Sequence, residues 1–322
     1  MLNPSDIKKI TSQLKPLTFV IEKDQKNIDD PLVQKYLNHY DINFSKSLPN
    51  VKHGFGRFDA DDFTIATHYW IPEMPRGTIF VLHGYYDHVG LFKNIIRFSL
   101  QNDYAVVAYD FPGMGLSSGD RASIGNFDEY RQVFEKCISL FNGVMPKPWY
   151  CIAQSAGSTA VTGHLVEAYT SPFKKVVLLA PLIRSKGWTR DKWSYLLVHW
   201  FLKSLPRTFT KNSHDEAFLT FLSKDDPMQY KRLPFRWIGA MKEWINDYKH
   251  FDPQDYPLLV IQGDDDGTVD YPYNVDQIKK IFPNTDVKII SGAKHHLVCE
   301  SAPYRAQIFS TIKSYLEKPD DD

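Results

Sequence analysis

Short apolar runs alternate with helical patterns from about residue 64 onward. Runs of β-branched and aromatic residues bounded by turn residues are typical of strands, and apolar residues spaced three and four apart predict amphipathic helices. The expected strands are 63–70, 78–82, 104–109, 149–153, 175–179, 257–261 and 286–290. Because nearly continuous apolar strands separated by helices are buried on both faces, this pattern predicts an α/β fold with a mostly parallel central sheet covered by helices on both faces.

Helices are expected between these strands. Apolar residues over 91–98 recur at helical spacing. Asn126 and Glu129 can form a capping box ahead of a further apolar helical pattern. Ser301 is expected to begin a last helix that ends near Pro319.

Two stretches break the alternation and set the predicted domain organisation. Residues 1–55 are rich in charge, and we expect an N-terminal extension that packs on the core or frays in part. Residues 185–250, the cap segment, lack a strand pattern but are rich in large apolar side chains, which predicts a helical insertion between two strands. The predicted α/β core comprises residues 56–184 and 251–318, and residues 319–322 form an acidic tail.

The cap segment is where the class of substrate would be determined. A cap of helices over the sheet can enclose an apolar acyl tunnel, because ligand pockets are lined mainly by hydrophobic side chains. In the alternative, these side chains only pack the cap segment against the core. Aromatic residues at the tunnel mouth would give transient contact with a membrane or micelle. The large apolar residues are Trp188, Trp193, Tyr195, Leu196, Leu197, Trp200, Phe201, Leu202, Phe209, Phe218, Phe221, Trp237, Met241 and Trp244.

Composition excludes several classes of function. Lys plus Arg and Asp plus Glu both number 38, so no strong field recruits nucleic acid or an anionic membrane. The cysteines Cys137, Cys151 and Cys299 are odd in number and lack C-x-x-C spacing, which argues against a zinc site or a disulfide framework and fits a reducing compartment. The N-terminus is polar and no apolar run is long enough to span a membrane, so we expect a soluble, cytoplasmic protein.

Ser155 is the candidate nucleophile, in the sequence Cys-Ile-Ala-Gln-Ser-Ala-Gly over 151–157. Small residues at Ala153 and Gly157 permit the tight strand-to-helix turn of a nucleophile elbow, which exposes the serine hydroxyl above a sheet. Ala153 replaces the commonest first glycine of G-x-S-x-G and adds one methyl group. Because so short a match is weak by itself, the partners of Ser155 decide its role.

Partners are expected after two later strands, because catalytic groups collect at the carboxyl ends of the strands in an open parallel sheet. One loop reads Gln-Gly-Asp-Asp-Asp-Gly-Thr-Val over 262–269, and the other reads Ser-Gly-Ala-Lys-His-His-Leu over 291–297. A buried acid orients an imidazole, which takes the serine proton and later delivers it to the leaving group. The chain order Ser, Asp, His is that of the α/β-hydrolase triad.

Each partner has to be chosen from several candidates. Asp266 occupies the fourth place of a G-x-x-D-x-x-V pattern, and His295 precedes an apolar pair in Gly-Ala-Lys-His-His, so these two are preferred. The other candidates are Asp264, Asp265, Asp270 and His296. In the alternative interpretation, the acidic residues form a solvated turn and the histidines a surface pair. A calcium-binding EF-hand loop is excluded, because placing Gly267 sixth puts Gln262 first and Tyr273 last.

A tetrahedral intermediate needs an anion site, and two backbone N–H groups supply fixed dipoles that require no reorganisation. Ala156, directly after Ser155, is expected to supply one, and Tyr85, which follows a glycine, the other. His83 and His88 in the same loop are expected to tie it to neighbouring backbone. The glycine-rich segment 110–117 lacks the G-x-x-x-x-G-K pattern of a phosphate-binding loop and is interpreted as a tight turn beside the site.

Over about residues 50–318 the chain resembles the α/β-hydrolase superfamily and, within it, the lysophospholipase and monoacylglycerol lipase family of serine hydrolases. The resemblance is carried by His83-Gly84 with Asp87-His88, Asp110 to Ser117, the elbow around Ser155, Gly263 to Val269, and Gly292-Ala293-Lys294-His295 followed by Glu300. It implies an α/β-hydrolase fold, a lid over the active site, esterase activity on single-chain lipids, and no metal or organic cofactor. Ala153 and the bulky pair Tyr85-Tyr86 depart from the family pattern and leave the substrate open.

The sequence therefore predicts hydrolysis of a carboxylic ester through an acyl-enzyme, with a lysophospholipid or monoacylglycerol as substrate. The assigned roles are Ser155 as nucleophile, His295 as general base and acid, Asp266 as orienting acid, and the N–H groups of Tyr85 and Ala156 as oxyanion hole. A carboxylesterase or thioesterase acting on smaller acyl substrates is the alternative. A non-catalytic protein that binds a hydrophobic ligand on the same fold is disfavoured by the complete triad. The oligomeric state is left open.

Overall fold

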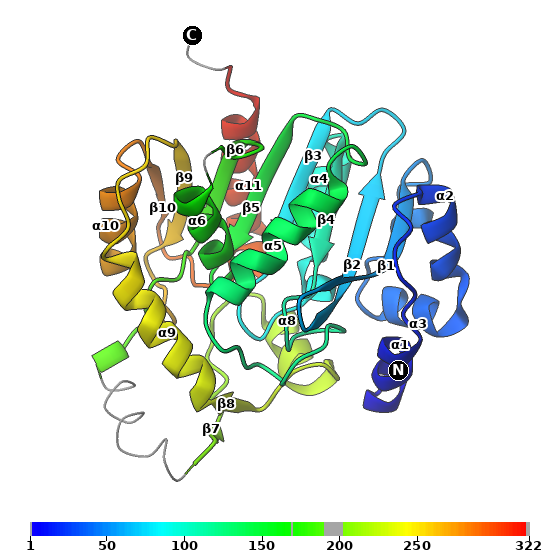
Figure 1. Ribbon diagram of the computed structural model, residues 1–322, viewed down its shortest axis with the longest axis horizontal. Helices are drawn as coiled ribbons and strands as arrows, with labels where there is room; N and C mark the ends of the chain where they lie inside the picture. The colour runs from blue at the N-terminus through cyan, green and yellow to red at the C-terminus, as the bar shows by residue number, and fades with distance from the viewer. Residues whose placement is uncertain (1, 169, 190–201, 320–322) are drawn as a thin grey trace.

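The computed structural model describes residues 2–168, 170–189 and 202–319, and a central sheet runs through it (Figure 1). The eight strands lie in the order β1-β2-β4-β3-β5-β6-β9-β10. Their bounds are β1 (Lys52–Ala60), β2 (Phe63–Ile71), β3 (Gly77–Leu82), β4 (Tyr104–Tyr109), β5 (Trp149–Gln154), β6 (Phe173–Leu179), β9 (Leu258–Gly263) and β10 (Asp286–Ile290). Strand β2 is antiparallel to β1 and β4, and the remaining neighbours are parallel, which confirms the mostly parallel sheet.

Helices cover both faces of the sheet because successive strand residues point to opposite sides. Phe80 and Leu82 of β3 belong to one buried cluster, and Ile79 and Val81 to the other. The helices are α1 (Pro4–Gln13), α2 (Ile21–Asp24), α3 (Pro31–His39), α4 (Lys93–Gln101), α5 (Asp128–Phe141), α6 (Gly157–Glu167), α8 (Glu216–Thr220), α9 (Phe235–Tyr248), α10 (Tyr271–Ile281) and α11 (Ala302–Glu317). In Figure 1, α5 and α6 lie in front of the sheet and α11 lies behind it.

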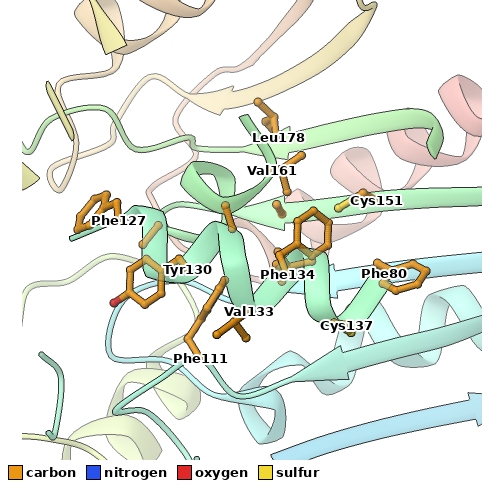
Figure 2. Close-up of a cluster of buried hydrophobic side chains, with 14 of the residues drawn as sticks. Phe80, Phe111, Phe127, Tyr130, Val133, Phe134, Cys137, Cys151, Val161 and Leu178 are labelled. Carbon is orange, nitrogen blue, oxygen red and sulfur yellow. The ribbon is translucent and has the colours of Figure 1, made fainter. Parts of the chain in front are cut away.

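The cluster beneath α5 fixes the position of that helix on the sheet. Phe134 and Cys137 of α5 lie beside Phe80 and Cys151 of the strands (Figure 2). At the start of α5, the side chain of Asn126 accepts a hydrogen bond from the N–H of Glu129 at 3.0 Å, which is one of the two bonds of the expected capping box. These buried side chains pack α5 against β3 and β5, and β5 leads into the turn that carries Ser155.

Strand β1 was not expected from the sequence. It contains two glycines and several charged residues, so it lacks the apolar pattern of the other strands. A side chain at Gly54 would clash with the ring of Tyr69 on the neighbouring strand β2, which explains why a residue unfavourable to strands lies here. Gly54 is therefore required by packing between β1 and β2, and the residues next to it in the sequence give no indication of this.

The N-terminal segment packs on the β1 edge of the sheet (Figure 1). Tyr36 and Leu37 of α3 are fully buried. Asp24 is buried and accepts hydrogen bonds from the N–H groups of Thr18 and Phe19 and from the hydroxyl of Tyr69. Of the two expectations for this segment, packing is therefore the one observed over residues 2–40.

The described part of the cap segment lies at one end of the sheet (Figure 1). It contains α8, a π-helical turn (Phe221–Asp225), α9, and two short antiparallel strands, β7 (Ser204–Pro206) and β8 (Arg232–Pro234). Besides the helices expected from the sequence, the segment therefore contains a short strand pair for which the sequence showed no pattern. Strands of three residues are too short to give an alternating pattern. Trp193, Tyr195, Leu196, Leu197, Trp200 and Phe201 lie outside the described residues.

Across the described residues, none of the helices combines the length and the apolar character needed to cross a bilayer.

Candidate active site

Ser155 lies on the turn between β5 and α6, in the strained backbone expected of an elbow. Its φ is +51°, a value that residues with a side chain seldom adopt. Its N–H donates to the carbonyl of Leu179 at 2.9 Å, which fixes the turn to strand β6. A Cβ atom at Gly157 would lie 2.6 Å from the carbonyl oxygen of His83, so the turn can be this tight only with glycine there. The backbone therefore fixes the direction in which the side chain of Ser155 leaves the turn.

The structure brings Ser155, His295 and Asp266 together in a hydrogen-bonded row. Nε2 of His295 lies 2.9 Å from Oγ of Ser155, and Nδ1 of His295 lies 2.8 Å from Oδ2 of Asp266. Their exposed fractions are 6%, 5% and 2% respectively. Each distance is that of a direct hydrogen bond, so the row has the geometry in which a histidine can take the serine proton.

Asp266 is held as an anion. Burial opposes its ionisation, but the charge and hydrogen bond of His295 and the N–H groups of Thr268 and Val269 outweigh burial, so the pKa of Asp266 is lowered. Those N–H groups reach Oδ1 at 2.7 and 3.1 Å, and Nε2 of Gln262 donates to Oδ2 at 3.0 Å. A carboxylate fixed in this way sets the orientation and tautomer of the imidazole.

The other candidate acids lie elsewhere. Asp264 and Asp265 are exposed, and the side chain of Asp264 accepts the N–H of Gly292 at 2.5 Å. Asp270 forms an ion pair with Arg184 at 2.6 Å. None of the three contacts a histidine within the described parts of the chain. Asp266 differs from these three because the turn buries its carboxylate and places it beside His295.

The loop after β3 lies against Ser155. A Cβ atom at Gly84 would come within 3.2 Å of Cβ of Ser155, and Tyr86 adopts a positive φ of +67°. The backbone N–H groups of Tyr85 and Ala156 have no hydrogen-bond acceptor among the described residues. The ring of Tyr85 stacks on Trp237 of α9 with centroids 3.7 Å apart, which directs this bulky side chain toward the cap segment.

The two histidines of this loop differ in their contacts. His83 lies 2.8 Å from the carbonyl of Gly84 and accepts the N–H of Phe111 at 3.0 Å, so the expected link to neighbouring backbone is confirmed. For His88 that expectation is wrong. Its Nε2 lies 3.0 Å from the Asp226 carboxylate, which also accepts the hydroxyl of Tyr40 at 2.7 Å. Asp226 belongs to the cap segment and Tyr40 directly follows α3, so both lie far from His88 in the sequence.

The turn 110–117 is held by its own side chains. The carboxylate of Asp110 accepts the N–H groups of Val89 and Leu116, both at 2.8 Å. The hydroxyl of Ser117 donates to the carbonyl of Asp110 at 2.5 Å and accepts the N–H of Ala66 at 2.9 Å. These contacts confirm a tight turn beside the site.

Sequence reasoning missed a buried ion pair beside the site. Nε2 of His296 lies 3.1 Å from Oδ1 of Asp87, and the amide of Gln154 lies 3.3 Å from Nδ1 of His296. Burial opposes charge on both members, but their mutual attraction outweighs it, so the pKa of His296 is raised and that of Asp87 is lowered. The pair ties the loop after β3 to the loop that carries His295. The sequence had singled out Asp87 and His296 separately, but nothing in it indicated that the two are paired.

Replacing His296 with leucine is expected to lower the free energy of unfolding by about 3–5 kcal/mol near neutral pH, because Asp87 would remain buried without its partner. The contribution of His296 is complete below the usual histidine pKa and is lost as pH rises through the raised value. The contribution of Asp87 is complete above the usual aspartate pKa and is lost as pH falls through the lowered value. Denaturant unfolding has to extend below the usual aspartate pKa of about 4 and well above the usual histidine pKa of about 6.5 to follow both limbs.

His250→Leu is the matched control, because His250 is exposed and should change stability by less than about 0.5 kcal/mol. A His296→Leu protein as stable as this control at every pH would contradict the role of the ion pair.

Ser155 and His295 line a cavity of about 500 Å³ between the sheet and the cap segment. Its apolar lining includes Leu182, Leu222, Phe235, Trp237, Ile238 and Met241. Four of these come from α9. A cavity of this volume with a large apolar part beside Ser155 is suited to part of an elongated hydrophobic molecule.

Comparisons with known proteins show the family and the fold of the chain. Residues 73–302 match the family model described as serine aminopeptidase, S33. The chain is 22% identical over 275 residues to a monoglyceride lipase homolog of Monkeypox virus, covering 80% of this chain and 96% of that protein. It is 23% identical over 239 residues to a probable lysophospholipase L2 of Haemophilus influenzae, covering 66% and 75%. A soluble variant of monoglyceride lipase from Saccharomyces cerevisiae, solved with a substrate analog, superposes with a TM-score of 0.69 and 18% identity over 81% of this chain and 94% of that one.

Proposed function

Because the chain belongs to the serine aminopeptidase S33 family and is a serine ester hydrolase with the α/β-hydrolase fold, we propose that it cleaves the ester bond of single-chain lipids, a lysophospholipid or a monoacylglycerol. The observation that carries this proposal is the row of Ser155, His295 and Asp266 opening on a cavity of about 500 Å³ that is partly lined by large apolar side chains. The names of the two relatives, a monoglyceride lipase homolog and a probable lysophospholipase, favour the same substrates.

The proposed reaction begins when Oγ of Ser155 attacks the ester carbonyl while Nε2 of His295 accepts its proton. Asp266 keeps the other ring nitrogen protonated and stabilises the imidazolium. The N–H groups of Tyr85 and Ala156 donate to the oxyanion, and collapse of the intermediate expels the alcohol, which takes the proton from His295. Water then attacks the acyl-enzyme with His295 again as base, and the fatty acid is released.

A panel of lysophospholipids, monoacylglycerols, acyl-thioesters and short nitrophenyl esters tests this proposal. If the cavity accepts the acyl chain, kcat/KM for saturated esters should rise roughly three- to fourfold for each added methylene until the cavity is filled, since each buried methylene contributes about 0.8 kcal/mol. A flat profile with preference for acetyl or butyryl esters would instead indicate a small-ester carboxylesterase whose cap side chains serve packing. Thioesters cleaved in preference to all oxygen esters would indicate a thioesterase.

A substitution that fills the cavity sharpens this test. Met241→Trp should move the longest accepted chain to shorter esters while activity on a nitrophenyl acetate remains, because Met241 lines the cavity outside the catalytic row. Met74→Trp is the matched control, since Met74 is 83% exposed and does not line the cavity. An unchanged length profile in Met241→Trp would place the acyl chain elsewhere.

A further inference from the structure

The lining of the cavity is not uniformly apolar. Cap residues 207–212 bring polar side chains to it, namely Arg207, Thr208, Thr210 and Asn212. The guanidinium of Arg207 stacks over the ring of Tyr86, 3.8 Å from the ring centroid. Tyr86 follows Tyr85, whose N–H is assigned to the oxyanion hole. A cation therefore stands beside the loop that faces the scissile bond.

Arg207 is held in place without being neutralised. One of its terminal nitrogens donates to Oε1 of Gln229 at 2.7 Å and to the carbonyl of Tyr230 at 3.4 Å, and Phe209 lies 4.5 Å from the guanidinium. Within the described ranges, no carboxylate forms an ion pair with it. Partial burial lowers its pKa, yet a guanidinium stays protonated in proteins. Its remaining N–H donors are available to a ligand.

The charges of the lining favour an anion. Lys186 is a second cation on the cavity wall, and its ammonium donates to the backbone carbonyl of Asp266 at 3.4 Å. The carboxylate of Asp87 also lines the cavity, but it is paired with His296. The half-buried Arg207 and the exposed Lys186 thus have no carboxylate partner in the described part of the wall, so both remain free to pair with an anionic group of a ligand.

Asn212 adds a second polar feature. Its side-chain oxygen Oδ1 is buried and has no hydrogen-bond donor among the described residues. Its backbone carbonyl accepts the N–H of His296 at 2.8 Å, which fixes Asn212 next to the catalytic loop. The residue itself is half-buried and lines the cavity, so a rotation of its side chain would bring this unpaired acceptor to a hydroxyl group of the ligand.

We propose that Arg207, supported by Lys186 and Asn212, forms a head-group site for a phosphate, so that the substrate is a lysophospholipid rather than a neutral monoacylglycerol. The glycerol of such a lipid joins the scissile ester to the phosphate and carries a free hydroxyl for Asn212. A guanidinium can bind phosphate oxygens through two parallel hydrogen bonds, which an ammonium cannot. This inference rests on the proposed function, in which the ester is cleaved at Ser155.

The test compares three lipids with the same oleoyl chain: lysophosphatidate, lysophosphatidylcholine and monooleoylglycerol. Arg207→Gln should lower kcat/KM for the phosphate-bearing lipids roughly 10- to 100-fold more than for monooleoylglycerol, as expected for loss of charged hydrogen bonds. Arg207→Lys should recover part of the difference. Lys203→Gln is the matched control, because Lys203 is an exposed cation of the same segment that does not line the cavity, and it should leave the ratio unchanged. A larger effect on lysophosphatidate than on lysophosphatidylcholine would identify a phosphomonoester as the preferred group.

An equal loss for charged and neutral lipids would overturn the head-group site and make Arg207 a packing residue of Tyr86. No loss for any lipid would overturn it as well. Calorimetric binding of an ether-linked lysophosphatidate to Ser155→Ala, with and without Arg207→Gln, separates the two proposals. Binding that depends on Arg207 supports the head-group site even if no ester is hydrolysed. Hydrolysis of monooleoylglycerol without any phosphate preference retains the proposed function and rejects the site.

Discussion

Ser155→Ala is expected to lower kcat on a nitrophenyl ester by roughly four decades or more, because no other hydroxyl takes the place of the nucleophile. His295→Ala should cost about as much. The double variant should be little worse than either single variant, since residues that act as one unit are not additive. Steady-state kinetics on purified variants measures all three.

Ser291→Ala is the matched control, because Ser291 is an exposed serine in the loop that carries His295. It should retain nearly full activity. Full activity of Ser155→Ala would reject the assignment of the nucleophile, and additive losses in the double variant would reject the coupling of Ser155 with His295.

Asp266→Asn is expected to lower kcat by roughly three to four decades, because an amide can donate to Nδ1 of His295 and hold the imidazole in the wrong tautomer. The lowered pKa of Asp266 means that the carboxylate remains ionised through the neutral pH range. Asp264→Asn and Asp270→Asn should be mild, since Asp264 caps an exposed turn and Asp270 pairs with Arg184. Kinetics of the three variants on one ester ranks them. The reverse ranking would transfer the role of orienting acid to another carboxylate.

The parts of the fold that could be predicted are those that local patterns report. Strands such as β3 and β9 are buried along their whole length, so their apolar runs are continuous and bounded by turn residues. Strand β1 lacks such a run, because Gly54 is required by the ring of Tyr69 on β2 and its other residues alternate imperfectly. Strands β7 and β8 are too short to carry a period. Strand β1 was therefore missed because its glycine is explained only by packing against β2, and β7 and β8 were missed because they are short.

The residues of the candidate site also fall into two groups, those that a local motif indicates and those that only tertiary packing brings together. Ser155, Asp266 and His295 each lie in a short motif at a strand end, so the sequence indicated them, and the structure places them within hydrogen-bonding distance. The ion pair of Asp87 with His296 joins residues far apart in the chain, and the contact of His88 with the cap segment does the same. Such contacts follow from tertiary packing. The catalytic roles themselves stay predictions until they are measured.

The most direct test of the central claim is to trap the acyl-enzyme. The protein is mixed with a nitrophenyl ester of a medium-chain fatty acid, quenched in acid within milliseconds to seconds, digested, and examined by mass spectrometry. The account predicts one acyl group per chain, attached to the peptide that contains Ser155, and its absence in Ser155→Ala. Hydrolysis of the ester with no acylated peptide, or acylation of a different residue, would contradict it.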